Sequence, residues 1–292
     1  MNQELSDWLR KGTFFRFRQH KIFYVDEGHG ECLLIFHGYP YNGYDFKYLL
    51  PRLSQQFRVI IPDMLGMGFS DKPVSYPYSF ENHVAMYRYL LDYLGIHSIH
   101  VLAHDLGNSV VQELLASFEE GERSIHILSI AFLNGGLFSD VYRPRPIQVL
   151  LSQSPPFIGK LLSRLISKRS VTSSTRSVFG INTQPSQELI DDFWEILNYN
   201  QGKRLAWKIG RLVFDKVRYQ QRWISAMKST RVKMCFINGP ADPNSGIHMA
   251  QRYMSLIPFA NVQLLSKDIG HWPQIEAPEE VLESYLFFLQ KV

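Results

Sequence analysis

The pentapeptide Ala103-His104-Asp105-Leu106-Gly107 decides the fold that we predict for this chain of 292 residues. It follows the apolar run 99–102 and precedes residues 108–113, which can begin a helix. The small residues Ala103 and Gly107 permit a sharp turn from strand into helix, which would expose the Asp105 carboxylate at the end of the strand. Because an Asp after a strand is also typical of a simple turn or a helix N-cap, further motifs are needed to assign a function.

A second motif, Phe36-His37-Gly38-Tyr39-Pro40, ends the apolar segment 32–36. Where a nucleophile occupies such a turn, two backbone N–H groups form an oxyanion hole beside it. One comes from the residue after the nucleophile, here Leu106, and the other from the loop after the third strand, here Tyr39. We expect both N–H groups to hold negative charge that develops on the Asp105 carbonyl oxygen, at about 3 kcal/mol per donor. The alternative interpretation is a Gly-Tyr-Pro turn without a chemical role.

Two further residues would complete a catalytic triad in the chain order nucleophile, acid, histidine. Asp242 follows the apolar segment 232–238, and His271 follows the short segment 262–265. Of the ten histidines, only His271 lies in a loop beyond the last predicted strand. We therefore predict that Asp242 orients His271 and that His271 acts as the general base for Asp105.

The other polar residues near these motifs are predicted to be structural. His37 and His104 flank the presumed site, and Asp63 and Asp71 lie in a glycine-rich loop that does not fit a dinucleotide-binding pattern. The end of the strand before the long insertion offers Asn134 instead of an acid, so Asp242 is the preferred acid of the triad.

An aspartate nucleophile restricts the reaction. Attack on an ester or amide would give an anhydride, whereas attack on a saturated carbon gives an alkyl ester that an activated water can hydrolyse. Halide displacement and epoxide opening both fit. Esterase or lipase chemistry is disfavoured because no serine stands at the turn and Ser109 falls inside the predicted helix. The mechanism needs no cofactor and no metal ion.

Together these motifs resemble the haloalkane dehalogenase and epoxide hydrolase branch of the α/β-hydrolase superfamily over nearly the whole chain. Further stretches resemble the mesoderm-specific transcript-like hydrolases within that branch: His37-Gly38-Tyr39-Pro40, Asn134-Gly135-Gly136-Leu137-Phe138, Arg143-Pro144, Val178-Phe179-Gly180 and Arg222-Trp223. The resemblance implies a small apolar organic substrate and water as reactants. A hydrolase fold can also serve as a ligand-binding or interaction protein, but such a protein would not need a complete triad.

The branch pattern bears on the leaving group. Haloalkane dehalogenases hold the halide with side-chain N–H donors at positions that here carry Leu106 and Tyr39, neither of which supplies one. Epoxide hydrolases carry an aromatic residue at the Tyr39 position and use cap tyrosines as acids, for which the resemblance suggests Tyr219 and secondly Tyr199. Epoxide opening is therefore the favoured reaction and haloalkane dehalogenation the alternative. Four tryptophans could replace the missing halide donor: Trp194, Trp207, Trp223 and Trp272.

Alternating apolar strands and helical stretches predict an α/β fold with a mostly parallel sheet and helices on both faces. Two more alternating segments, 14–18 and 21–25, are typical of an antiparallel hairpin. About ninety residues separate the sixth and seventh strands, too many for one crossover helix. We expect the α/β-hydrolase core to comprise residues 1–134 and 230–292 and a helical cap to comprise residues 135–229. A single helix is expected over 44–56.

The composition is that of a globular protein, with 45% hydrophobic and 20% charged residues and a net charge of +4. No nucleic-acid-binding motif is present, and Cys32 and Cys235 fall in predicted strands. Without an apolar N-terminal signal or a membrane span, we expect a cytoplasmic protein. The basic amphipathic stretch 161–169 is expected to pack its apolar face on the core, the alternative being a membrane-surface role.

Overall fold

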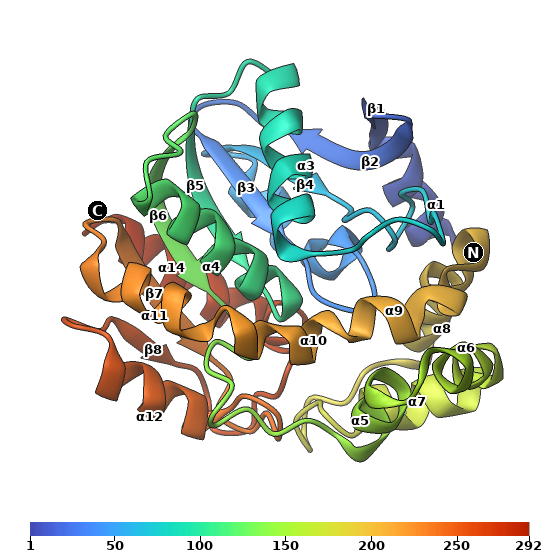
Figure 1. Ribbon diagram of the computed structural model, residues 1–292. Helices are drawn as coiled ribbons and strands as arrows, with labels where there is room; N and C mark the ends of the chain where they lie inside the picture. Colours follow the sequence, from blue (N-terminus) through green and yellow to red (C-terminus); the bar gives the residue numbers. More distant parts are fainter. Residues whose placement is uncertain (292) are drawn as a thin grey trace.

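The apolar strand segments come together as one eight-stranded sheet in the computed structural model, which describes residues 1–291 (Figure 1). The strand order is β1-β2-β4-β3-β5-β6-β7-β8. β1 and β2 form an antiparallel hairpin, β2 pairs antiparallel with β4, and all other pairs are parallel. The predicted mostly parallel sheet is confirmed. The strands are β1 Thr13–Phe17, β2 His20–Glu27, β3 Cys32–Phe36, β4 Arg58–Pro62, β5 Ser98–Ala103, β6 His126–Phe132, β7 Lys233–Asn238 and β8 Val262–Leu264.

Helices cover both faces of the sheet because the central strands are apolar on both sides. In β3, Leu34 and Phe36 pack into one apolar layer, while Leu33 and Ile35 pack into the other. The first layer lies under α3 Phe80–Tyr93, α4 Leu106–Glu119, α11 Gln220–Ser229 and α12 Ile247–Leu256. The second lies under α1 Gln3–Lys11, η1 Gly43–Phe46, α2 Leu50–Leu53, α13 Pro273–Glu276 and α14 Pro278–Leu289.

The chain between β6 and β7 is helical. Figure 1 shows α5, α6 and α7 together at the lower right edge of the molecule, away from the sheet. α11 differs from them, because its Trp223 is buried in the core and donates its indole N–H to Glu113 of α4 at 2.8 Å. The remaining elements are α5 Pro146–Gln153, α6 Pro156–Leu165, α7 Lys168–Arg176, α8 Gln187–Asn198, η2 Tyr199–Leu205, α9 Ala206–Gly210, α10 Leu212–Asp215 and η3 Lys216–Arg218.

One expected helix was incomplete, and the helices α1 and α7 were not predicted. The expected helix over 44–56 is two short pieces, η1 and α2, because Pro51 cannot donate the backbone hydrogen bond that a continuous helix needs. The helix α1 has Asn2 as its N-cap, and the Asn2 side chain accepts a hydrogen bond from Leu5 N at 2.8 Å. α7 is rich in serine and threonine, which have modest helix propensity, and it forms with Val171 and Thr175 buried against the rest of the protein.

Within residues 1–291, no helix is both long and apolar enough to cross a lipid bilayer.

Candidate active site

The turn from β5 into α4 exposes Asp105, which has a positive φ of 50°. A non-glycine residue in this region is strained, so the surrounding structure must hold it there. The Asp105 N–H donates to Asn134 O at 2.8 Å. Two glycines let other loops approach closely. A Cβ atom on Gly38 would lie 2.8 Å from Asp105 Cβ, and one on Gly135 would lie 2.7 Å from Asp105 Cα.

The structure brings the three predicted triad residues together. His271 Nδ1 lies 2.8 Å from Asp242 Oδ2, and His271 Nε2 lies 3.6 Å from Asp105 Oδ2. Asp242 and His271 come from loops that follow β7 and β8, so the three side chains meet at the carboxyl ends of parallel strands. The side chains of Asp242 and His271 are 0% and 5% exposed, whereas that of Asp105 is 12% exposed. Asp105 is thus the most accessible group of the three.

The Asp242 carboxylate is held by several donors. Its Oδ2 accepts from Ser245 Oγ at 2.5 Å and from Asn134 Nδ2 at 3.2 Å, and its Oδ1 accepts from Asn244 N at 2.8 Å. With His271 Nδ1 as a fourth partner, the carboxylate has little freedom to rotate. A fixed acid in this position holds the imidazole ring with Nε2 toward Asp105.

Burial and charge act in opposite directions on this pair. Burial alone would raise the pKa of Asp105, but the adjacent His271 lowers it to well below the ordinary carboxyl value. Burial alone would lower the pKa of His271, but the charge of Asp242 and the contact with Asp105 raise it to about 10. Both shifts favour the charged forms, a carboxylate beside an imidazolium.

The two backbone donors named from the sequence lie beside the nucleophile. Tyr39 N donates to Asp105 Oδ1 at 2.9 Å. Leu106 is the first residue of α4, so its N–H has no acceptor within the helix and points out of the helix N-terminus. With Oδ1 held by Tyr39, Oδ2 is the oxygen that faces His271 Nε2.

Asp105 and His271 line a cavity of about 280 Å³ beneath the helices that follow β6. This volume is near the lower end for small-molecule sites. Apolar side chains from α5, α6, α7, α8 and α10 form much of the wall. The polar side chains on it are Tyr39, Tyr41, Arg145, Gln148, Ser152, Ser170, Ser174, Thr175 and Asn244.

The two tyrosines suggested as ring-opening acids do not line this cavity. Tyr219 stacks on Trp223 with ring centroids 5.2 Å apart and packs edge-on against Phe80. Tyr199 packs edge-on against Phe69 at 5.0 Å. Both suggestions are corrected. Both rings pack against other aromatic rings in the apolar layers, and the position of a tyrosine in the sequence does not predict such packing.

Tyr41 is a tyrosine of the cavity wall whose hydroxyl can accept its one hydrogen bond and keep its own proton for another acceptor. Its hydroxyl shares a hydrogen bond of 3.0 Å with Thr175 Oγ1, and its ring stacks on Phe193 with centroids 4.0 Å apart. Tyr39 also lines the cavity, but its hydroxyl donates to Ala206 O at 2.9 Å. Burial raises the pKa of Tyr41 above its ordinary value, so its phenol keeps its proton.

The four tryptophans considered as halide donors do not supply one to the cavity. Trp272 lines it, but its indole N–H donates to Asp45 Oδ2 at 3.2 Å. The Trp223 N–H is engaged by Glu113, and Trp194 and Trp207 are not part of the wall. The described residues therefore contain no indole donor for a bound halide.

The polar residues expected to be structural have hydrogen bonds that suit that role. His37 Nε2 accepts from Met64 N, and His104 Nε2 lies 2.8 Å from His271 O. Asp63 accepts from Gly43 N at 3.0 Å and from Phe69 N at 2.7 Å. These contacts fix the loops on which the nucleophile and the base stand.

Sequence reasoning missed two residues that support the site. Asn134 was considered only as a vacant acid position, yet its side chain reaches Asp242 while its carbonyl accepts from Asp105. Lys216 is buried, donates from Nζ to Gly136 O at 2.9 Å and lies 3.9 Å from the centre of the Tyr142 ring. Asn134 could have been found from the sequence, because it is a polar residue directly after an apolar strand. The sequence around Lys216 contains no pattern that predicts its burial.

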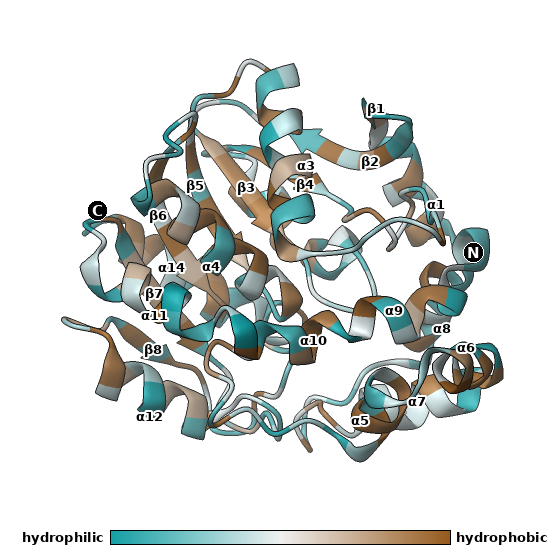
Figure 2. Cartoon of the chain, in the orientation of Figure 1, coloured by the Kyte–Doolittle hydropathy of each residue, from teal (hydrophilic) through white to brown (hydrophobic). Residues whose placement is uncertain are grey.

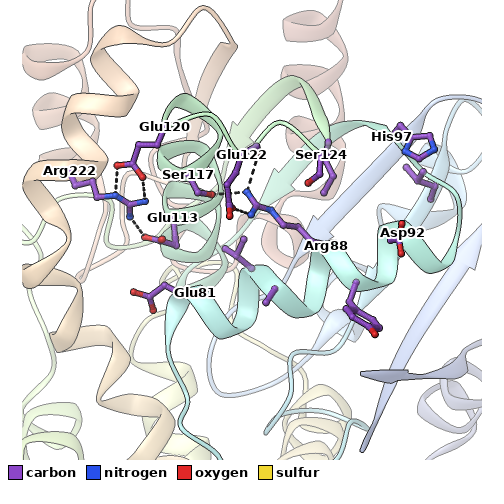
Figure 3. A pocket seen from close by; sticks show the side chains of 15 residues that line it. Glu81, Arg88, Asp92, His97, Glu113, Ser117, Glu120, Glu122, Ser124 and Arg222 are labelled. Carbon is purple, nitrogen blue, oxygen red and sulfur yellow. Dashed lines mark hydrogen bonds and ion pairs between the residues drawn. The ribbon is translucent and has the colours of Figure 1, made fainter. Parts of the chain in front are cut away.

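A larger hollow of about 740 Å³ lies on the outer side of α3 and α4 (Figure 3). Five of its charged side chains are paired with one another: Arg222 contacts Glu113 and Glu120, and Arg88 contacts Glu122. It lies on the helical flank, away from the strand ends that carry the triad. We therefore place the candidate site at the smaller cavity.

Comparison with known proteins identifies the family of the chain. The family model described as alpha/beta hydrolase fold matches residues 31–278. The mesoderm-specific transcript homolog protein of Bos taurus is 32% identical over 301 residues, covering 99% of this chain and 89% of that protein. The LipZ protein of Mycobacterium tuberculosis is 31% identical over 287 residues and covers 98% of each chain.

Among solved structures, the epoxide hydrolase CorEH has a TM-score of 0.77 with this chain at 20% sequence identity. The match covers 96% of this chain and 98% of that one. At this identity the similarity establishes the fold.

Proposed function

The chain belongs to the alpha/beta hydrolase fold family, and from that premise we propose that it hydrolyses small apolar substrates at a saturated carbon with Asp105 as nucleophile. The observation that carries the proposal is the arrangement of Asp105, His271 and Asp242 at the end of the cavity. The favoured substrate class is an epoxide.

The first step forms an ester. Asp105 Oδ2 attacks an epoxide carbon, the carbon–oxygen bond breaks, and the released alkoxide takes a proton from a neighbouring donor. Oδ1, which accepts from Tyr39 N, becomes the carbonyl oxygen of the ester. The low pKa of Asp105 keeps the carboxylate ionised and able to attack.

The second step hydrolyses the ester. Once Asp105 is esterified it no longer carries the charge that raises the pKa of His271, so His271 releases its proton more readily and can act as a base. His271 Nε2 takes a proton from water, and the hydroxide attacks the ester carbonyl carbon. The N–H groups of Tyr39 and Leu106 stabilise the oxyanion. When the oxyanion collapses, the bond between the carbonyl carbon and the alkoxy oxygen breaks, and the leaving alkoxide takes the proton from His271 to give the diol. Asp105 then passes the proton of its new carboxyl group to His271 and is a carboxylate again.

A single turnover in heavy-oxygen water tests this mechanism. Because water attacks the carbonyl carbon of the ester, the new oxygen of the first product comes from Asp105 and the label enters the carboxylate. We expect peptide mass mapping to find the label on Asp105 and none in the first diol. Label in the first diol and none on Asp105 would instead mean that water attacks the substrate directly, with Asp105 as a base.

Tyr41 is the group we propose as the acid for ring opening. Tyr41→Phe should slow ester formation from epoxides by about 100-fold, because general acids contribute on this scale, and leave ester formation from haloalkanes unchanged. Stopped-flow or quench measurements of the pre-steady-state phase would give both rates. Tyr219→Phe serves as the matched control and should behave as wild type, and equal rates in the Tyr41 and Tyr219 variants would remove Tyr41 from the mechanism.

Haloalkane dehalogenation is the second candidate, since it uses the same ester. The absence of an indole donor on the wall among the described residues weakens it. A third candidate, a ligand-binding protein without turnover, would bind apolar molecules in the cavity but put no label on Asp105.

A further inference from the structure

The helices α5 and α6 carry apolar side chains that residues 1–291 leave at least half exposed. On α6, Phe157, Leu161 and Leu165 follow one another at intervals of four residues and are 73%, 56% and 67% exposed. Residues at this interval lie on the same side of a helix. The expectation that stretch 161–169 packs its apolar face on the core is therefore wrong for Leu161 and Leu165, whereas Leu162 and Ile166 of the same stretch are half-buried and line the cavity.

The buried side of α6 explains this orientation. Gly159 and Ser163 face inward, and Ser163 Oγ accepts from Trp207 N at 3.0 Å. These small residues let α6 approach α9 closely, so the large apolar residues point outward. Ile147 and Leu150 of α5 are also about half exposed, and Figure 2 shows hydrophobic segments on both α5 and α6. We call Ile147, Leu150, Phe157, Leu161 and Leu165 the apolar cap face.

The segment of chain that carries the apolar cap face has charged side chains of one sign. Residues 141–187 contain seven basic side chains and no Asp or Glu, whereas the remaining chain has 24 basic and 27 acidic side chains. Lys160 and Arg164 each lie three residues after an exposed apolar residue of α6, which places them on the adjoining strip of the helix. Among the described residues, Lys168 with Asp191 is the one ion pair that a basic residue of this segment makes.

Two residues of the apolar cap face also line the cavity. Ile147 and Leu165 are 55% and 67% exposed, and both belong to the cavity wall on which Asp105 and His271 lie. A side chain that is at once exposed and part of the wall must stand at a mouth. The mouth of the cavity is therefore bordered by the apolar cap face, on a segment whose charged side chains are all basic.

We propose that the apolar cap face docks on the surface of an anionic lipid bilayer. Exposed leucine and phenylalanine enter the interface, while the basic side chains contact headgroup phosphates; this combination is what surface-bound amphipathic helices use. A second copy of the chain would set the same positive charges against each other, so it fits less well. In the docked protein, the mouth would receive an apolar substrate from the bilayer. This second step rests on the proposed function, whereas the docking does not.

Flotation with lipid vesicles tests the proposal without any measurement of catalysis. The wild-type protein should bind vesicles of phosphatidylcholine with about 30% phosphatidylglycerol at least about tenfold more strongly than vesicles of phosphatidylcholine alone, and added salt should weaken the binding. The double variant Leu161→Asp/Leu165→Asp should lose binding at least about tenfold. Phe259→Asp, at a fully exposed phenylalanine outside the cap face, is the matched control and should bind as wild type.

Circular dichroism would show that each variant is folded. Lys160→Glu/Arg164→Glu, which leaves the apolar side chains in place, provides a second test and should also abolish the preference for phosphatidylglycerol. The proposal is overturned if the wild type does not bind these vesicles or if both double variants bind as well as wild type. It is also overturned if light scattering shows a wild-type dimer that the leucine substitutions dissociate while vesicle binding stays absent, because the face would then be a self-association surface.

Discussion

A His271→Gln variant is expected to react with one substrate molecule at Asp105 and then stop. Ester formation needs only the carboxylate, which Tyr39 N still holds, whereas hydrolysis needs the base that the substitution removes. Turnover should fall by about 10³-fold or more, and the ester should accumulate. Glutamine is chosen because it preserves a polar side chain of similar size next to Asp242.

Intact mass spectrometry after incubation with separate panels of epoxides and haloalkanes measures this outcome. An epoxide adds its whole mass to the protein, while a haloalkane adds its alkyl group and releases halide, so the mass increase identifies the leaving group. Peptide mapping should place the adduct on Asp105. His97→Gln, at an exposed histidine on the far flank of α3, is the control and should turn over without an adduct. Normal turnover by the His271 variant would show that another group is the base.

The central part of the site could be predicted because local sequence dictates it. A short apolar strand, a small residue, Asp105 and a glycine define one turn, and the same kind of local pattern marks Tyr39, Asp242 and His271 at other strand ends. Parallel strands present their carboxyl ends at one edge, so residues identified separately had to lie close together. The mostly parallel sheet followed from the same alternation of apolar strands and helices.

The cavity wall could not be predicted in the same way. The contact of Tyr41 with Thr175 joins residues 134 positions apart, and Thr175 stands on α7, a helix of low intrinsic propensity. The ring of Tyr219 is used to stack on Trp223. Such choices depend on how the helices after β6 pack on one another, and a single sequence carries no periodic signal for that packing. The outward orientation of α6 has the same origin.

An Asp105→Asn variant is expected to lose activity by about 10⁴-fold or more while keeping its fold. The amide cannot form the ester, so no adduct should appear with either substrate panel. Asparagine tolerates the positive φ of this position better than most residues, which preserves the turn. The matched control is Asp140→Asn, an exposed acid paired with Arg252, whose activity should remain at the wild-type level.

The same variant should change the titration of His271. In the wild type, the charges of Asp242 and Asp105 raise its pKa to about 10, so removing one of the two charges lowers it. A raised histidine pKa contributes stability that is fully present below the ordinary value near 6.5 and is lost as the pH rises through the raised one. In the variant, the stability lost with rising pH should therefore be smaller, and the loss should be complete at a lower pH than in the wild type. Imidazole NMR titration and denaturant unfolding across this range would test both effects, and an unchanged His271 pKa would mean that Asp105 does not set the charge state of the base.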